Sequence, residues 1–181
     1  FFEEFIDEIL KSGISVVYIH ARNAILKGIS PKGNRNIPPL NYEFVSKIKS
    51  KYPNITFILN GGIDSIEKAL RLSRINDGVM LGRLIQNNPF CLKDVDKLFF
   101  NKPNNYIISE NTIKEYFDYI RPKLGKDSIY RLLSPLLNIF FGIPDGKQFK
   151  IDIHSNMKYH NFDNLEKIFL KFVNDKKLLI N

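Results

Sequence analysis

Three short apolar segments of the sequence each pass into residues that suit anion binding. They end in His20-Ala21-Arg22, in Asn60-Gly61-Gly62 and in Gly82-Arg83. Glycine has no Cβ, so its backbone can approach a phosphate closely, and arginine can hold two phosphate oxygens at once. If the three ends lie side by side, we expect them to form one binding site for a phosphorylated ligand.

Each end has a simpler explanation when it is taken alone. Gly61-Gly62 is compatible with a tight turn, Arg83 with a surface ion pair, and His20 with a hydrogen-bonded histidine of the core. The shared context favours the phosphate site, because the two glycines lead directly into a helix for which Asp64 is the expected N-cap. The N–H groups at a helix N-terminus attract anions.

The elements that must position these residues follow a regular order. Three strands are predicted, of which the first two are expected to be fully buried because they are β-branched runs without helical periodicity: "ISVVYIHA" (14–21), "ITFILNGG" (55–62) and "DGVMLGR" (77–83). A helix over residues 2–12 precedes them, and Asn41 is the expected N-cap of another. Strands that alternate with helices predict parallel βα units, whose ligands bind at the carboxyl ends of the strands.

The second part of the chain carries helical patterns only. They follow the segment "FFNKPNNYIIS" (99–109), and the last of these helices has Asp163 and Glu166 in the spacing of a cap pair. We therefore predict two domains: βα units over residues 1–100 and an all-α domain over residues 106–181.

The charge of the chain is concentrated. Of the formal net charge of +8, residues 14–53 supply +6, from seven basic residues against the single acid Glu43. Such a concentration favours a polyanionic partner, although a solvated, lysine-rich surface is the simpler alternative.

The single cysteine, Cys91, excludes a disulfide framework and a multi-cysteine metal site, and it suits a reducing compartment. No apolar run is long enough to span a membrane, and no secretory signal is recognisable. The sequence thus predicts a protein of the cytoplasm or of an organellar matrix, without a metal. Its oligomeric state stays open.

One long motif resembles a known family. "HARNAILKGISPKGNRNIPPL" (20–40) is similar to the signature of the A-type tRNA-dihydrouridine synthases, "NGGI", "GVMLGR" and "NPF" follow in that family's order, and "GIPDGKQFK" (142–150) resembles its helical-domain motif. The resemblance implies an α/β fold: the last three strands of a (β/α)8 TIM barrel, followed by an all-α domain that helps to bind tRNA.

The resemblance also implies an activity, a cofactor and a set of residues. The family reduces uridine 20/20a in the tRNA D-loop with FMN as the cofactor and NADPH as the electron donor. His20 would contact the flavin, and Asn60, Gly61 and Gly62 would line its ribityl-phosphate. The phosphate would be bound by Gly82 and Arg83.

Four basic residues fall where the family contacts RNA: Lys32, Arg35, Lys147 and Lys150. Lys147 and Lys150 stand where the family usually has arginines, so the positive charge is kept but the planar guanidinium that binds phosphate in a bidentate manner is lost. The family's proton-donating cysteine is expected upstream of Phe1, and Cys91 does not take that role. We therefore expect the chain to be the C-terminal part of a longer enzyme and to be inactive alone.

Two alternatives stay open at this point. The first is a flavin-dependent barrel oxidoreductase that acts on a small molecule, which needs the phosphate loops but not the basic segment. The second is a non-catalytic RNA-binding remnant.

Overall fold

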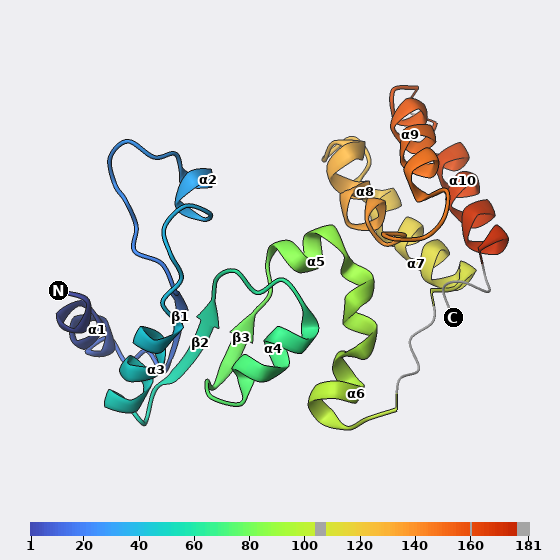
Figure 1. Cartoon of the computed structure of the whole chain (residues 1–181). Helices are drawn as coiled ribbons and strands as arrows, with labels where there is room; N and C mark the ends of the chain where they lie inside the picture. Colours follow the sequence, from blue (N-terminus) through green and yellow to red (C-terminus); the bar gives the residue numbers. More distant parts are fainter. Residues whose placement is uncertain (104–107, 160, 177–181) are drawn as a thin grey trace. The chain divides into compact units, whose positions relative to one another are not determined.

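The computed structural model describes residues 1–103, 108–159 and 161–176. The chain divides into two compact units, residues 1–84 and 85–181 (Figure 1). Within the described residues, the first unit contains a parallel sheet with helices and the second contains helices without a sheet. The α/β layout expected for the first half is therefore confirmed, whereas its membership of a barrel stays a prediction.

Three strands form the sheet in the order of the sequence: β1 (Val16–His20), β2 (Thr56–Asn60) and β3 (Gly78–Met80). All neighbours are parallel, and the register pairs His20 with Asn60 and Asn60 with Met80. The strands therefore finish at the same level. The segments that follow them all start from one edge of the sheet (Figure 1).

Helices accompany the strands: α1 (Phe2–Leu10), α2 (Pro31–Asn34), α3 (Tyr42–Lys51) and α4 (Ile66–Ser73). α3 contacts β2, and α4 contacts β3. The core of this unit consists of apolar side chains of the strands and helices, among them Ile6, Val45, Ile48, Phe57, Leu59 and Ala69. Burial of these side chains fixes the sheet against its helices and so holds the strand ends in place.

The prediction that the first strand is fully buried is wrong. Ile19 is 5% exposed, but Val16 and Tyr18 are 46% and 65% exposed. Successive side chains of a strand point to opposite faces, so the pattern shows that β1, at the edge of this sheet, is covered on one face only. The sequence does not indicate this one-sided burial, because β1 carries apolar residues on both faces.

Side-chain caps fix the starts of two helices. Asn41 accepts a hydrogen bond from the Phe44 amide at 2.9 Å, as predicted. The N-cap of α4 is Ser65, not Asp64: the Ser65 hydroxyl accepts from the Lys68 amide at 3.1 Å. Aspartate and serine both cap helices well, so the path of the backbone decides which of the two adjacent residues is the N-cap.

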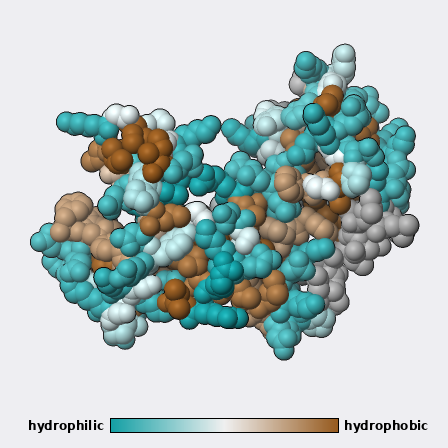
Figure 2. All heavy atoms as spheres, in the orientation of Figure 1, coloured by the Kyte–Doolittle hydropathy of each residue, from teal (hydrophilic) through white to brown (hydrophobic). Residues whose placement is uncertain are grey.

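The second unit follows a boundary that falls within α5 (Arg83–Asn87). Its further elements are η1 (Pro89–Asp94), α6 (Val95–Phe100), α7 (Glu110–Ile120), η2 (Arg121–Lys123), α8 (Ile129–Leu137), α9 (Gly146–Met157) and α10 (Phe162–Asp175). Their core is rich in aromatic rings, some of which pack edge to face: Phe149 lies 5.1 Å from Phe140 and 4.9 Å from Phe169, centroid to centroid. Hydrophilic residues make up most of the face that Figure 2 shows.

The expected cap pair of the last helix does not cap it. Asn161 is the N-cap of α10, and its side chain accepts from the Asn164 amide at 3.0 Å. Asp163 and Glu166 instead each accept a hydrogen bond from the Arg121 guanidinium at 2.8 Å. The spacing of the two acids predicts a local helix cap, whereas their partner lies 42 and 45 residues away in the sequence.

Candidate functional site

The ends of β1 and β2 lie against each other. The Ala21 amide donates to the Asn60 carbonyl at 2.8 Å, which extends the parallel pairing by one residue. A Cβ placed on Gly61 would lie 3.5 Å from Cε1 of His20. The structure thus brings His20 and the glycine turn together, as the strand order predicts.

Arginines from the ends of β1 and β3 hold the loop that follows β1. Arg22 donates to the carbonyl of Asn36 at 3.3 Å and to that of Pro38. Arg83 donates to the side-chain oxygen of Asn36 and, at 3.3 Å, to the carbonyl of Arg35. Asn36 is therefore bonded to both arginines and connects the loop to two strand ends.

His20 is surrounded by positive charge. Its ring is exposed, so the alternative of a core histidine is wrong. Partial burial and the nearby guanidinium groups of Arg22, Arg83 and Arg35 lower the pKa of His20 below its ordinary value of 6.5. This environment favours the neutral imidazole, and the three cations around it attract an anion rather than another cation.

The turn after β2 has a backbone that favours glycine. Gly61 and Gly62 have φ angles of +122° and +60°. A Cβ on Gly62 would lie 2.5 Å from a methyl of Leu40, so the loop packs directly against the turn. Two side chains hold the turn's carbonyl groups: the Tyr42 hydroxyl donates to Gly61 and the Lys68 ammonium donates to Gly62, each at 2.7 Å.

The remaining predicted residues of this unit border the same loop or the end of β3. A Cβ on Gly82 would meet nothing within 4 Å, so the backbone there is open to a close approach. Lys32 lies in α2, whose N-cap is Ser30, and both Lys32 and Arg35 are exposed. Guanidinium groups, a glycine turn and open backbone at one sheet edge fit a phosphate group.

The whole sequence was compared with models of protein families. The model described as "Dihydrouridine synthase (Dus)" matches residues 1–174. The chain belongs to the dihydrouridine synthase family. The resemblance seen in the sequence motifs is therefore confirmed.

Curated relatives carry a more specific name. The chain is 35% identical over 150 residues to the tRNA-dihydrouridine(20/20a) synthase of Xanthomonas axonopodis pv. citri, a match that covers 82% of this chain and 44% of the relative. It is 34% identical over 169 residues to the synthase of that name from Shigella flexneri, which covers 92% and 50%. The synthase of that name from Salmonella typhimurium is 36% identical over 155 residues, which covers 84% and 47%. The chain thus spans about half the length of the curated relatives it matches.

The second unit places the two predicted RNA-binding lysines differently. Lys147 is exposed on α9. The Lys150 ammonium instead donates to the side-chain oxygen of Asn138 at 2.7 Å, and the Asn138 amide donates to the Gln86 carbonyl at 2.7 Å. The Lys147 side chain is therefore open to solvent, whereas the Lys150 ammonium is already bonded to Asn138.

Cys91 lies in η1 and is half-buried. Among the residues that the structure describes, no cluster of histidine, cysteine and acidic side chains can hold a metal ion. In the same residues, no helix has both the length and the apolar character that crossing a membrane requires.

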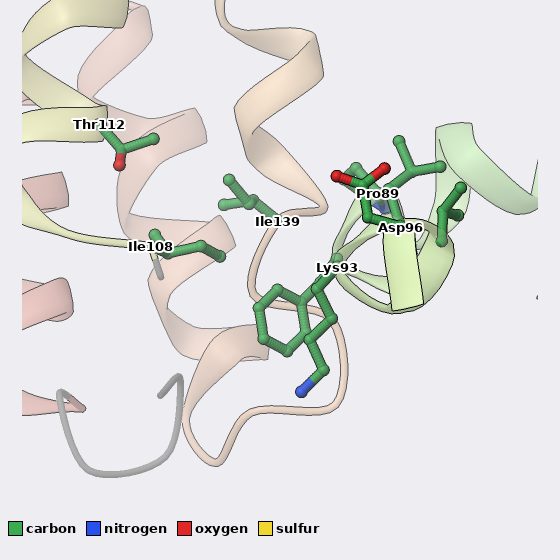
Figure 3. A pocket seen from close by; sticks show the side chains of 9 residues that line it. Pro89, Lys93, Asp96, Ile108, Thr112 and Ile139 are labelled. Carbon is green, nitrogen blue, oxygen red and sulfur yellow. The ribbon is translucent and has the colours of Figure 1, made fainter. Parts of the chain in front are cut away.

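A pocket of about 470 Å³ lies within the second unit and contains none of the predicted site residues. Ile108 and Ile139 line one side of it, and Pro89 and Asp96 the other (Figure 3). The Lys93 ammonium lies 4.3 Å from the centre of the Phe90 ring, which also lines the pocket. Its walls are mainly apolar, unlike the strand ends.

Three residues that support the site are not indicated by the sequence motifs: Asn36, Tyr42 and Lys68. Arg22, by contrast, is one of the strand-end residues that the sequence predicts to suit anion binding. Asn36 accepts hydrogen bonds from two arginines, and Tyr42 and Lys68 donate to carbonyls of the glycine turn. No local pattern distinguishes these three from surface residues.

Proposed function

We propose that the chain supplies the cofactor-phosphate side of a tRNA-dihydrouridine synthase that reduces uridine 20/20a with FMN and NADPH. The observation that carries the proposal is the meeting of three arginines near the strand end that holds His20. Arg22 and Arg83 both donate to Asn36, and Arg83 also donates to the carbonyl of Arg35. Family membership and the names of the relatives support the same function.

In this proposal the flavin phosphate lies between the glycine turn at Gly61-Gly62 and the end of β3. Arg83 binds phosphate oxygens, and the open backbone at Gly82 permits the close approach. Asn60 lies beside His20 in the register and contacts the ribityl chain, while the neutral imidazole of His20 faces the flavin. When bound, FMN supplies the two-electron reduction of the uracil C5–C6 bond.

The basic loop contributes to tRNA binding. Lys32 and Arg35 are exposed on a loop that Arg22 and Arg83 hold in place, so their charges stay beside the site. Each phosphate that such a residue contacts releases counterions, which makes the affinity for tRNA fall with salt. Lys147 and Lys150 would add contacts from the all-α domain, for which we retain residues 106–181. Residues 1–100 would form the last three βα units of the barrel.

We expect the isolated 181 residues to bind these ligands without reducing uridine. The family's chemistry assigns the proton to a cysteine, and the described strand ends carry none, since Cys91 lies in η1. A tRNA-modifying enzyme works where tRNA is, so we place the intact protein in the cytoplasm or an organellar matrix. Dihydrouridine formed by the isolated chain with FMN and NADPH would refute the expectation of inactivity.

A comparison of FMN with riboflavin tests the phosphate site, because the two flavins differ by the phosphate alone. The wild-type chain is titrated with each, and quenching of flavin fluorescence gives the two dissociation constants. We expect FMN to bind more tightly, and Arg83→Ala to remove most of that preference. Arg74→Ala, at the end of α4, is the matched control and leaves the preference unchanged. Equal affinity of the wild type for both flavins would contradict the proposal.

Binding of tRNA separates this function from a flavin enzyme that acts on a small molecule. We expect the affinity for unmodified tRNA to fall steeply as the salt concentration rises, with a shallower slope in the variant Lys32→Ala. An affinity for tRNA that is weak and independent of salt would favour the small-molecule enzyme.

A further inference from the structure

Helix α9 presents a mixed basic and apolar face to solvent. Its buried face packs into the core with Gly146, Phe149, Ile153 and Met157. The opposite face carries exposed residues that recur at helical spacing: Lys147, Ile151, His154 and, one residue past the helix, Lys158. Residues spaced in this way lie one above another along the helix surface.

An aromatic pair lies in the middle of this face. The ring of Tyr130, from the first turn of α8, stacks on the ring of His154 with 5.7 Å between centroids and 28° between planes. Tyr130 is 57% exposed, and the Ile151 side chain, three residues before His154, is 48% exposed. The stacked rings are therefore held against each other while much of their surface stays in contact with water.

Positive charge flanks the aromatic pair on both sides along the axis. At 1.5 Å per residue, Lys147 lies about 10 Å before His154 and Lys158 about 6 Å after it. Between Gly146 and Lys158 the only acid is Asp152, whose carboxylate accepts a hydrogen bond from the Gln148 amide at 2.9 Å. Along the helix axis, this face therefore presents a lysine, then the aromatic pair, then a second lysine.

We propose that Tyr130 and His154 form a stacking platform for an unpaired base of the bound tRNA. Lys147 and Lys158 contact the phosphates on either side of that base. The proposal rests on the proposed function, in that it requires the chain to bind tRNA. A ring that a second ring already backs is a suitable surface for a base, since every base has a π-face and no sequence-specific hydrogen bond is needed. A paired duplex keeps its bases stacked internally and offers none to the platform.

Substitution of the platform tests this in the 181-residue chain with fluorescently labelled, unmodified tRNA. We expect Tyr130→Leu and His154→Ala each to weaken binding about tenfold, which corresponds to ~1.4 kcal/mol. Tyr130→Phe keeps the ring and retains wild-type affinity. The matched control is Tyr119→Leu, because Tyr119 is 62% exposed in the same unit but its ring is covered by the Lys123 ammonium at 3.6 Å.

Salt and the form of the RNA distinguish stacking from charge. Tyr130→Leu should leave the slope of log affinity against log salt unchanged, whereas Lys147→Ala should reduce it by about one. On a fully paired RNA duplex, Tyr130→Leu should bind like the wild type. Circular dichroism and urea unfolding identify a variant that fails to fold, and His154→Ala then provides the second, independent reading.

The possible failures are distinguishable. If the wild type binds tRNA and the folded variants Tyr130→Leu and His154→Ala bind it equally well, the platform is disproved while the proposed function stands. If the wild type does not bind tRNA, the tRNA part of the proposed function fails, and the platform fails with it.

Discussion

Arg83 donates hydrogen bonds to the side-chain oxygen of Asn36 and to the carbonyl of Arg35. The carbonyl of Asn36 also accepts from Arg22 at 3.3 Å. The arginine that we assign to the cofactor phosphate therefore also holds the basic loop that we assign to tRNA. One side chain thus links the two proposed binding surfaces, through the Asn36 side chain and the Arg35 carbonyl.

The variant Asn36→Ala should separate these two roles. It removes the oxygen that Arg83 contacts but no group assigned to the phosphate. We expect the affinity for tRNA to fall about fivefold, the equivalent of ~1 kcal/mol for one hydrogen bond, while the preference for FMN over riboflavin persists. Asn54→Ala, on the turn before β2, is the control for a lost asparagine. A loss of flavin preference in Asn36→Ala would show that the loop and the phosphate site cannot be separated.

Alanine substitutions at Gly61 and Gly82 should affect different properties: the first the stability of the fold, the second the binding of FMN. Gly61→Ala forces a residue with a Cβ to a φ of +122°, so we expect the free energy of unfolding to fall by about 1–3 kcal/mol. A Cβ on Gly82 would meet nothing within 4 Å, so Gly82→Ala should change the free energy of unfolding by no more than about 0.5 kcal/mol. It should nevertheless weaken FMN binding, because in our proposal the phosphate occupies the space beside Gly82. Urea unfolding and flavin titration measure the two effects. Equal destabilisation by both substitutions would be inconsistent with the backbone geometry.

The start of α4 provides a matched pair of cap variants. Ser65→Ala removes the hydroxyl that accepts from the Lys68 amide, and we expect it to lower the free energy of unfolding by about 1 kcal/mol. Asp64→Ala removes an exposed carboxylate that lies 3.3 Å from the Lys68 ammonium, which should cost at most a few tenths of a kcal/mol, roughly the value of a surface ion pair. Thermal or urea unfolding decides between them, and a larger effect of Asp64→Ala would restore the cap predicted from the sequence.

The lowered pKa of His20 predicts a pH dependence of stability. Its pKa is lower in the folded chain than the ordinary 6.5, so the unfolded chain binds more protons as the pH falls below 6.5. The contribution is fully present above pH 6.5, declines as the pH falls toward the folded pKa, and changes no further below it. We expect His20→Asn to unfold with a shallower pH dependence in that window. His154→Asn is the control for a histidine elsewhere, and identical profiles of wild type and His20→Asn would contradict the prediction.

The sequence predicted the elements of the first unit well, because their signals are local. Gly61-Gly62 marked the turn after β2, and Asn41 marked the start of α3, since a backbone conformation or a cap depends on adjacent residues. Errors arose where two neighbours suited the same role, as at Asp64 and Ser65. They also arose where a residue has a distant partner, as with Asp163 and Arg121.

By itself, the sequence determined the order of strands and helices, the concentration of basic residues after β1 and the family to which the chain belongs. Each of these depends on residue type and on short-range spacing. Only the tertiary structure decided that Asn36 joins Arg22 to Arg83, that Lys150 bonds to Asn138, and that Tyr130 stacks on His154. Those pairs are separated by 12 to 47 residues, and it is the packing of strands and helices that brings them within reach.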